Sequence, residues 1–165
     1  MDYTLRRART ADVRVVSRLV SENVASGRLL NKTAVNLYED VQEFWVAEGE
    51  AGVVGCGALH VMWEDLAEIR TVAVRGDHQG HGIGHKIVAT LLEEARQVGV
   101  SRVFVLTFAV DFFAKHGFAE IDGIAVTPAV YAELLRSYDE GVAEFLDLDR
   151  VKPNTLGNTR MLLRL

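Results

Sequence analysis

The sequence predicts a single domain of the α+β or α/β class. Segments rich in β-branched and aromatic residues alternate with amphipathic helical segments, and this alternation is typical of both classes. One strand–loop–helix–strand unit runs from Ala67 to Phe108. The 165 residues, of which 49% are hydrophobic, suffice for one core of ordinary size. We therefore expect one domain over residues 1–165.

Composition excludes several classes of function. Lys and Arg number 18 against 23 Asp and Glu, a net charge of −5, which disfavours broad electrostatic binding to nucleic acid or to an anionic membrane. The single cysteine, Cys56, excludes an internal disulfide and a multi-cysteine zinc site, and it reads best as a buried small hydrophobe. We find no apolar run of the roughly 18 residues that a membrane span needs and no secretory signal, so a soluble cytoplasmic protein is expected.

The first third of the chain predicts one strand and two helices. Tyr3–Ala8 alternates weakly and is expected to be a strand. Thr10 is the predicted N-cap of the first helix, with Asp12 in its first turn and its end at Gly27. Thr33 is expected to cap a short second helix through Val41. The apolar stripe of the first helix comprises Val13, Val16, Leu19, Val20 and Val24.

Three strands and the longest helix come next. The strands are predicted at Glu43–Ala47, Val53–Met62 and Ala67–Val74, and the second is apolar enough to be central in the sheet. A glycine-rich stretch, Gly76–Gly84, then opens an amphipathic helix. The predicted buried face of this helix comprises Ile83, Ile87, Val88, Leu91, Leu92, Ala95 and Val98.

The last third predicts two further strands and two short helices. Arg102–Phe108 is strongly β-prone, and Asp111–His116 reads as a short helix stopped by Gly117. Thr127-Pro128 is a favourable helix start, an N-cap followed by proline at the first helical position. The apolar face of that helix is predicted to contain Val130, Leu134 and Leu135, and the closing strand to run from Arg160 to Leu165.

The glycine stretch carries the first functional signal. The segment 79–84 reads Gln-Gly-His-Gly-Ile-Gly and lies between a predicted strand and a predicted helix. A P-loop would need a Lys-Ser/Thr pair after its last glycine, and a dinucleotide fingerprint would need a different glycine spacing. Two interpretations remain open. The glycines and the first helical amides form an anion site suited to a pyrophosphate, or the segment is a tight turn without a ligand.

Two motifs, taken with this stretch, resemble a known family. The segment 67–74, Ala-Glu-Ile-Arg-Thr-Val-Ala-Val, is followed by Gln79-x-x-Gly82-x-Gly84, which resembles the acetyl-CoA-binding motif of the GNAT superfamily of N-acetyltransferases. The segment 112–118, Phe-Phe-Ala-Lys-His-Gly-Phe, resembles a second motif of that family. The resemblance implies the GNAT acyl-CoA N-acyltransferase fold, a mixed, mostly antiparallel sheet that is flanked by helices and splayed at the acetyl-CoA site.

A narrower resemblance covers essentially the whole chain. The segments 53–59, 102–107, 145–148, 151–154 and 160–163 resemble N-acetylglutamate synthases, in particular their short single-domain actinobacterial forms. This resemblance implies an amino-acid N-acetyltransferase that uses acetyl-CoA on the α-amine of L-glutamate or L-glutamine, the first step of arginine biosynthesis. Arginine as a feedback inhibitor and a homodimer are further expectations from the resemblance. Acetylation of another amine (a protein N-terminus or an antibiotic) and a non-catalytic acyl-CoA sensor stay open as alternatives.

The resemblance also implies where acetyl-CoA lies. The backbone of the strand before the glycine loop would pair with the pantetheine amides, and the loop amides would hold the pyrophosphate. Two aromatic residues would pack near the cofactor, although plain core residues would look the same in the sequence. The implied cofactor-binding residues are Val72, Ala73, Val74, Gln79, Gly80, His81, Gly82, Ile83, Gly84, Phe112 and Phe113.

Catalysis needs a base, because an amine must lose a proton when it attacks a thioester. By resemblance Glu68 occupies the position of the family's catalytic glutamate, and its alternative role is a carboxylate that is solvated or paired with Arg70. Phe113 stands where many family members carry a tyrosine acid, so the sequence names no general acid. His81 and His85 have helical spacing but no cysteine ligand beside them, so no functional metal is expected.

Substrate binding is expected to rest on basic and polar side chains, because buried carboxylates need such partners. Arg70 is two residues from Glu68 and is expected to share its strand face. For each basic residue, an exposed side chain without a ligand is the alternative. The candidate substrate-binding residues are Lys32, Arg70, Thr107, Lys152, Asn158, Thr159 and Arg160.

Overall fold

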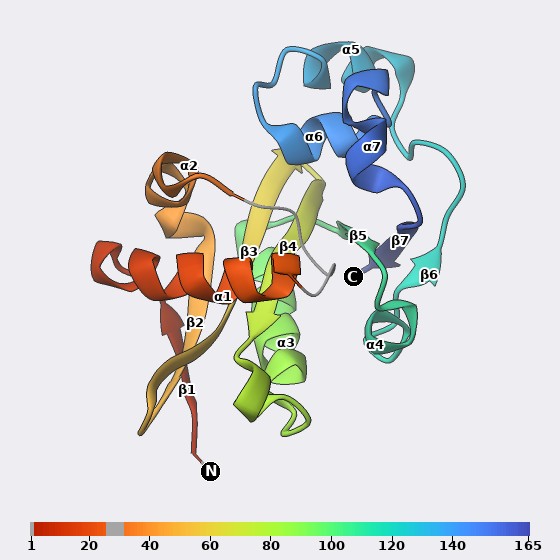
Figure 1. The fold of residues 1–165 in the computed structure, drawn as a ribbon. Helices are drawn as coiled ribbons and strands as arrows, with labels where there is room; N and C mark the ends of the chain where they lie inside the picture. Colours follow the sequence, from red (N-terminus) through yellow and green to blue (C-terminus); the bar gives the residue numbers. More distant parts are fainter. Residues whose placement is uncertain (1, 26–31) are drawn as a thin grey trace. The chain divides into compact units, whose positions relative to one another are not determined.

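The computed structural model describes residues 2–25 and 32–165 of the chain. Within these residues seven strands are hydrogen-bonded in the order β1-β2-β3-β4-β5-β7-β6, an open mixed sheet flanked by helices (Figure 1). The predicted α+β class and mixed sheet are confirmed. The strands are β1 (Thr4–Arg7), β2 (Phe44–Gly49), β3 (Gly52–Trp63), β4 (Leu66–Val74), β5 (Arg102–Thr107), β6 (Ala119–Glu120) and β7 (Thr159–Arg164).

The helices lie before, between and after these strands. The α-helices are α1 (Val13–Ala25), α2 (Ala34–Glu39), α3 (Ile83–Val98), α4 (Val110–Ala114), α5 (Pro128–Leu134), α6 (Glu140–Phe145) and α7 (Lys152–Thr155). Short 3₁₀ helices are η1 (Thr10–Asp12), η2 (Val41–Glu43), η3 (Gly76–His78) and η4 (Asp149–Val151). No helix in the described part of the chain is both long and apolar enough to span a membrane.

Residue contacts divide the chain into two compact units, which are described in turn. Unit one comprises residues 1–60 and 69–99, and unit two comprises residues 61–68 and 100–165. The expectation of one domain over 1–165 stays a prediction. Unit one contains the glycine stretch, and unit two contains Glu68 and the C-terminal third of the chain.

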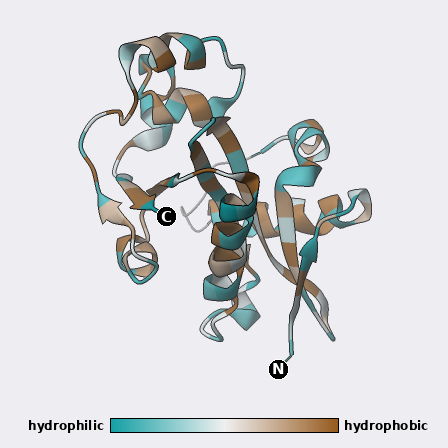
Figure 2. Cartoon of the chain, turned by 180° about the vertical axis from the view of Figure 1, so that it is seen from behind, coloured by the Kyte–Doolittle hydropathy of each residue, from teal (hydrophilic) through white to brown (hydrophobic). Residues whose placement is uncertain are grey.

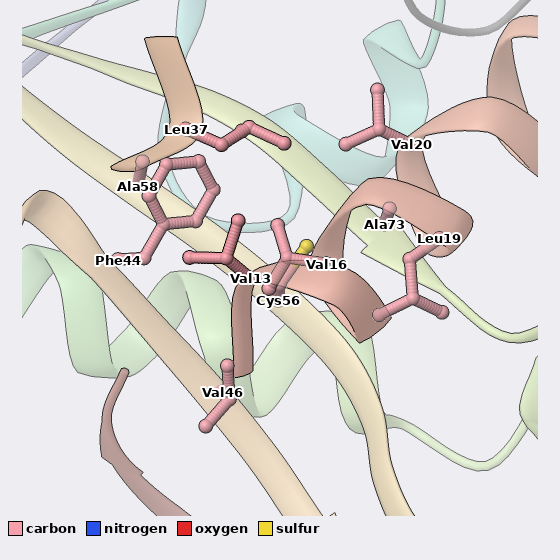
Figure 3. Close-up of a cluster of buried hydrophobic side chains, with 10 residues drawn as sticks. All are labelled: Val13, Val16, Leu19, Val20, Leu37, Phe44, Val46, Cys56, Ala58 and Ala73. Atoms are coloured by element: carbon pink, nitrogen blue, oxygen red, sulfur yellow. The ribbon is translucent and has the colours of Figure 1, made fainter. Parts of the chain in front are cut away.

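One face of the sheet in unit one is covered by α1 and α2. β1 pairs antiparallel with β2, and β2 pairs antiparallel with β3. Figure 3 shows apolar side chains from both helices meeting those of the strands around the Cys56 sulfur. The first four residues of the predicted α1 stripe are buried, which confirms its inward face. The cluster comprises Val13, Val16, Leu19, Val20, Leu37, Phe44, Val46, Cys56, Ala58 and Ala73.

The opposite face of this sheet is covered by α3. Gly55 and Gly57 flank Cys56 in β3, so their face is the reverse of the one that meets α1. A β-carbon at Gly55 would lie 2.9 Å from Cδ1 of Ile87, and one at Gly57 would lie 2.6 Å from its Cγ2. Glycine at both positions therefore lets α3 pack directly on the strand. Figure 2 shows α3 carrying both hydrophilic and hydrophobic residues, as an amphipathic covering helix requires.

Three expectations for unit one need correction or remain outside the structure. Arg9, not Thr10, is the N-cap of η1, because the Arg9 amide donates to Asp12 Oδ2 at 2.7 Å and Asp12 thereby closes the turn. Val98, predicted on the buried face of α3, is 51% exposed because it occupies the last turn. The predicted helix end at Gly27 lies outside the described residues.

Other local predictions are confirmed. Thr33 caps α2, with its hydroxyl accepting from the Asn36 amide. In unit two Thr127 caps α5 in the same way, and Pro128 occupies the first helical turn. Gly117 follows α4 with φ +96, and its predicted place after the short helix is confirmed.

Unit two is built around β5. Residues Leu66–Glu68 of β4 pair with β5 in parallel, and β7 pairs antiparallel with β5 and with β6. α5 and α6 contribute apolar residues to the core above these strands, where the rings of Phe104 and Phe145 meet edge to face at 4.9 Å. Leu134 is buried in this core, but Leu135 is 49% exposed, so its predicted place on the apolar face is wrong. β5 ends at Thr107, one residue before its predicted end at Phe108.

Candidate active site

The glycine loop of unit one connects β4 to α3. Gly80 and Gly82 have φ values of +81 and +79, and Gly82 is the N-cap of α3. A β-carbon at either glycine would meet no atom within 4 Å, so the space beside the loop backbone is open. The Gln79 side-chain amide donates to the Val74 carbonyl at 3.1 Å and ties the loop to the end of β4. Backbone conformation, not crowding, is thus the reason for glycine here.

This loop has the chemistry of an anion site. The amides of the first turn of α3 point outward because they have no carbonyl partner within the helix. The dipole of a 16-residue helix adds positive potential at the same end. The residues present therefore fit the pyrophosphate of a coenzyme A molecule, which favours the anion-site interpretation of segment 79–84.

A small charged cluster precedes the loop. Arg75 donates to Asp77 Oδ1 at 2.6 Å, and His78 Nδ1 lies 2.8 Å from the same oxygen. The Arg75 guanidinium, with a smaller effect from His78, holds the pKa of the Asp77 carboxyl well below its usual range. The cluster joins three side chains of the turn that follows β4.

The backbone of β4 is irregular at Thr71. This residue has φ +58, a left-handed conformation that is rare for a β-branched residue. Its side chain is buried, and its hydroxyl oxygen has no hydrogen-bond partner among the described residues. The Cys56 thiol donates to the Thr71 carbonyl at 3.5 Å. Strain of this kind is concentrated at functional sites, so it singles out the middle of β4.

The side chains of Val72 and Ala73 are consistent with a backbone role for this segment. Ala73 itself is buried in the cluster that Figure 3 shows, and a β-carbon at Gly57 would lie 3.4 Å from a Val72 methyl. Residues 72–74 could therefore meet a cofactor arm mainly through their amides and carbonyls. Burial raises the pKa of the Cys56 thiol to about 12, so it stays protonated and does not serve as a nucleophile.

Glu68 is a buried carboxyl group in unit two. It is 4% exposed and lies opposite Phe104 in the parallel pairing of β4 with β5. Its charge acts on Arg160, so Glu68 combines burial with a nearby cation. Burial argues against a solvated carboxylate at a strand end, whereas the catalytic role and pairing with Arg70 both stay open.

Arg160 of β7 binds the backbone of two other segments. Its Nε donates to the Gly123 carbonyl at 3.2 Å, and its terminal nitrogens donate to the carbonyls of Glu144 and Phe145 at 3.2 and 2.5 Å. The guanidinium also lies 5.0 Å from the centre of the Phe104 ring. Burial lowers the pKa of Arg160, while the negative charges of Asp147 and Glu68 act in the opposite direction. Arg160 thus has a structural role that the sequence did not reveal.

The other predicted substrate-binding residues of unit two are dispersed. Thr107 and Thr159 are direct partners in the β5–β7 pairing, and the Thr107 hydroxyl accepts from the Ala109 amide at 2.8 Å. Lys152 is exposed and pairs with Asp147 at 3.3 Å. The Asn158 side chain donates to the Asn154 carbonyl at 3.4 Å. Of the C-terminal candidates, β5 and β7 therefore bring together Thr107, Thr159 and Arg160.

The aromatic pair divides between two environments. Phe113 is buried and meets Phe112 at 5.0 Å and Phe118 at 5.4 Å between ring centres, all edge to face. Phe112 is half-buried and lies beside His116. The core interpretation accounts for Phe113, and Phe112 retains the exposure that a cofactor contact needs.

Lys32 and Arg70 are half-buried residues of unit one. Lys32 immediately precedes Thr33, the N-cap of α2. The expectation that Arg70 shares a face with Glu68 stays a prediction. No cluster of three or more metal-ligating side chains occurs within residues 2–25 and 32–165.

Sequence reasoning gave little weight to two features of unit one. His60 Nδ1 is hydrogen-bonded to the Glu43 carboxylate, with one oxygen at 3.2 Å, but nothing in either local pattern links these residues. Thr71 is the second feature. A threonine within a β-prone run looks ordinary in the sequence, because its rare φ is set by the surrounding structure.

Comparison with known proteins matches most of the chain to one family. Residues 17–118 match the model described as the acetyltransferase (GNAT) family. A protein of Mycobacterium tuberculosis named amino-acid acetyltransferase is 61% identical over 162 residues, which are 96% of this chain and 92% of that protein. A Neisseria meningitidis protein of the same name is 32% identical over 117 residues, 70% of this chain but 27% of that protein.

Solved structures share the fold. The crystal structure of Rv2747 from Mycobacterium tuberculosis in complex with CoA and NLQ has a TM-score of 0.95 and 61% identity, covering 98% of this chain and 99% of that chain. N-acetylglutamate synthase from Neisseria gonorrhoeae, complexed with coenzyme A and N-acetyl-glutamate, has a TM-score of 0.79 at 23% identity. The match covers 100% of this chain and 35% of that chain, and at 23% identity it supports the fold alone.

Proposed function

This chain belongs to the acetyltransferase (GNAT) family, and we propose that it transfers the acetyl group of acetyl-CoA to the α-amine of L-glutamate or L-glutamine. One observation carries the choice of substrate class. The Mycobacterium tuberculosis protein that is 61% identical over nearly both whole chains is named amino-acid acetyltransferase. The product would be N-acetylglutamate or N-acetylglutamine. Formation of N-acetylglutamate is the first step of arginine biosynthesis.

The glycine loop would bind the phosphate end of the co-substrate. The amides around Gly80 and Gly82 and the first turn of α3 would hold the pyrophosphate, and the backbone of Val72–Val74 would pair with the amides of the arm. Acetyl-CoA supplies an activated acetyl group on a thioester, whose thiolate leaves readily. The chain's own task is to hold this group beside the amine and to remove one proton.

Glu68 would take that proton. The amine nitrogen bonds to the carbonyl carbon, the carbon–sulfur bond breaks, and the sulfur leaves with its electron pair as a thiolate. The proton lost by the nitrogen goes to the Glu68 carboxylate, directly or through water. Glu68 is 4% exposed, so this proton transfer would take place away from bulk water. The residues assigned here include no general acid, since Phe113 cannot donate a proton.

Substrate carboxylates need cationic or hydroxyl partners. Lys32 and Arg70 are half-buried, and we assign them first to this role. Thr107, Thr159 and Arg160 form a second group in unit two, although Arg160 already gives three of its five donors to backbone carbonyls. Lys152 and Asn158 are assigned to the edge of the proposed substrate site.

The test measures thiol release from acetyl-CoA with each of the twenty amino acids, in the presence and absence of arginine. Turnover confined to glutamate or glutamine supports the proposal, and its suppression by arginine would add feedback control. Absence of turnover with every free amino acid, despite tight acetyl-CoA binding, would overturn the proposal and direct the search to protein amines or a sensing role. A cytoplasmic location and a homodimer belong to the same proposal, and fractionation and light scattering test them.

A further inference from the structure

Thr71 carries two uncompensated costs in the middle of β4. Its φ of +58 places a β-branched residue in the left-handed region, where steric clash is severe. Its hydroxyl is buried, with the residue 6% exposed, and has no hydrogen-bond partner among the described residues. A buried hydroxyl without a partner loses its hydrogen bonds to water and gains none in return.

Neither cost has a structural benefit that the contacts reveal. The Cys56 thiol donates to the Thr71 carbonyl, which belongs to the backbone and would be present with any residue here. Valine would fill the same volume without an unpaired hydroxyl, and glycine would adopt this φ without strain. Groups held at such cost in native proteins are generally satisfied in a functional state.

The position of Thr71 identifies what could satisfy its hydroxyl. The proposed base, Glu68, and the end of β4 at Val74 are six residues apart, about 20 Å of extended strand. The proposed pyrophosphate loop follows directly after this strand. A ligand with its phosphates at the loop and its thioester at the base must run along β4, and Thr71 stands midway. The polar groups of such an arm are two amides, a hydroxyl and a thioester, and the amides and the thioester offer carbonyl oxygens that can accept a hydrogen bond.

We infer that the Thr71 hydroxyl binds the acyl-pantetheine arm by donating a hydrogen bond to one of its carbonyl oxygens. Thr71 is then a binding residue whose side chain is satisfied only in the complex. This inference rests on the proposed function for its choice of ligand, an acyl-CoA. The carbonyl belongs either to an amide of the arm or to the thioester, and the experiment separates the two.

The experiment compares wild type with Thr71→Val, which replaces the hydroxyl with a methyl group, and Thr71→Ser, which keeps the hydroxyl. Thr90→Val is the matched control, because Thr90 donates to the Lys86 carbonyl on α3 and belongs to the same unit. Thermal unfolding is measured without ligand. Calorimetry then gives the affinity for acetyl-CoA, for CoA, and for adenosine 3′,5′-bisphosphate, which lacks the arm.

The expected result separates stability from binding. Thr71→Val unfolds at the same or a higher temperature than wild type, because an unpaired hydroxyl has been removed. It binds acetyl-CoA about five- to tenfold more weakly, the loss of one hydrogen bond, and binds adenosine 3′,5′-bisphosphate as wild type does. A matching loss for CoA assigns the hydroxyl to an amide carbonyl, and a loss for acetyl-CoA alone assigns it to the thioester. Thr71→Ser keeps most of the affinity.

Two results would overturn the inference. In one, Thr71→Val binds all three ligands as wild type does. In the other, Thr71→Val melts well below wild type while Thr71→Ser does not, which means that the hydroxyl is already satisfied in the free protein. Both measurements are independent of turnover. A wild-type protein that binds acetyl-CoA but acetylates no amino acid would therefore refute the proposed substrate and leave this inference to be decided by affinity.

Discussion

Ile87 of α3 lies directly against Gly55 of β3, with its Cδ1 atom 2.9 Å from the place that a β-carbon would occupy. Gly57, two residues further, has the Cγ2 atom of the same side chain at 2.6 Å. The helix that begins at the glycine loop thus packs on the sheet over two missing side chains. Ile87 contacts both positions, and Ile83 and Leu91 each contact one of them. The position of the glycine loop depends on these contacts, because α3 begins at Ile83, within the last residues of the loop.

These contacts predict two different mutational outcomes. Gly55→Ala should destabilise the protein by about 1–3 kcal/mol through overpacking, and Ile87→Val should restore part of the loss because it removes Cδ1. Gly57→Ala should not be rescued by Ile87→Val, since valine keeps the Cγ2 methyl. Urea unfolding of the single and double variants measures both effects. Equal rescue at the two glycines would contradict this packing.

Gly82 predicts a loss of co-substrate binding. Alanine at φ +79 is strained by roughly 1 kcal/mol even though open space surrounds it, so Gly82→Ala should turn the loop amides away from their present directions. We expect weaker binding of CoA by calorimetry. Gly76→Ala is the matched control, because a β-carbon there also meets nothing within 4 Å and its φ lies outside the left-handed region. Equal affinities of the two variants would argue against an anion site.

Glu68→Gln should slow the chemical step. The amide cannot accept the amine proton, so kcat should fall by about 10²- to 10⁴-fold while the affinity for acetyl-CoA is kept. The measurement is steady-state kinetics together with calorimetry on the same preparation. Glu64→Gln, in the exposed turn before β4, serves as the control and should retain activity. A Glu68→Gln enzyme with normal kcat would remove Glu68 from catalysis.

Arg160→Ala should destabilise unit two. The change leaves the carbonyls of Gly123, Glu144 and Phe145 without their donor, which we expect to cost on the order of 3 kcal/mol in the free energy of unfolding. Arg164→Ala, on the same strand but exposed, should cost much less. Guanidinium chloride unfolding compares the two variants. Similar stabilities would mean that Arg160 serves a ligand more than the fold.

Asp12 predicts a dependence of stability on acid. Hydrogen bonds from Arg6 at 2.8 and 3.0 Å lower the pKa of Asp12 below its ordinary 3.8. The carboxylate therefore stabilises the fold above pH 3.8, and this contribution is lost as the pH falls through the lower folded pKa. Asp12→Asn should be less stable than wild type by about 1–3 kcal/mol at pH 7.

The ion pair between Arg6 and Asp12 also determines how the effect of Asp12→Asn on stability changes with pH. Because wild type loses the contribution in acid and Asp12→Asn never has it, the difference in unfolding free energy between the two should narrow as the pH falls below 3.8. Asp122→Asn, at an exposed carboxylate, provides the comparison. Urea unfolding at several pH values measures the gap, and a constant gap would contradict the assignment of Asp12.

Local signals in the sequence predicted much of the fold. Thr33 and Thr127 were identified as caps because a hydroxyl before an apolar helical run acts on amides only three residues away. The same logic failed at Thr10, because Asp12 accepts the Arg9 amide and so shifts the cap by one residue. Phe108 and Leu135 are apolar but exposed, since hydropathy alone does not reveal which residues end an element.

The candidate site was predictable only where its chemistry is local. Gly80 and Gly82, which both have positive φ, lie within the six-residue segment 79–84. The spacing of the glycines in that segment was therefore enough to identify the loop. Arg160 was chosen for a substrate carboxylate, but its donors reach carbonyls 15 to 37 residues away that the sequence cannot pair with it. Thr71 gave no signal, because its strain and its unpaired hydroxyl arise from tertiary structure.

The order of strands has a consequence for synthesis on the ribosome. Every segment of unit one has left the peptidyl-transferase centre once Gly99 has been added, whereas β5 must wait for β7, made more than fifty residues later, to gain its second neighbour. Nascent chains therefore carry a completed glycine loop well before the strands beside Glu68 are covered. Slow codons between residues 108 and 159 would prolong the interval in which β5 offers an open edge to other chains.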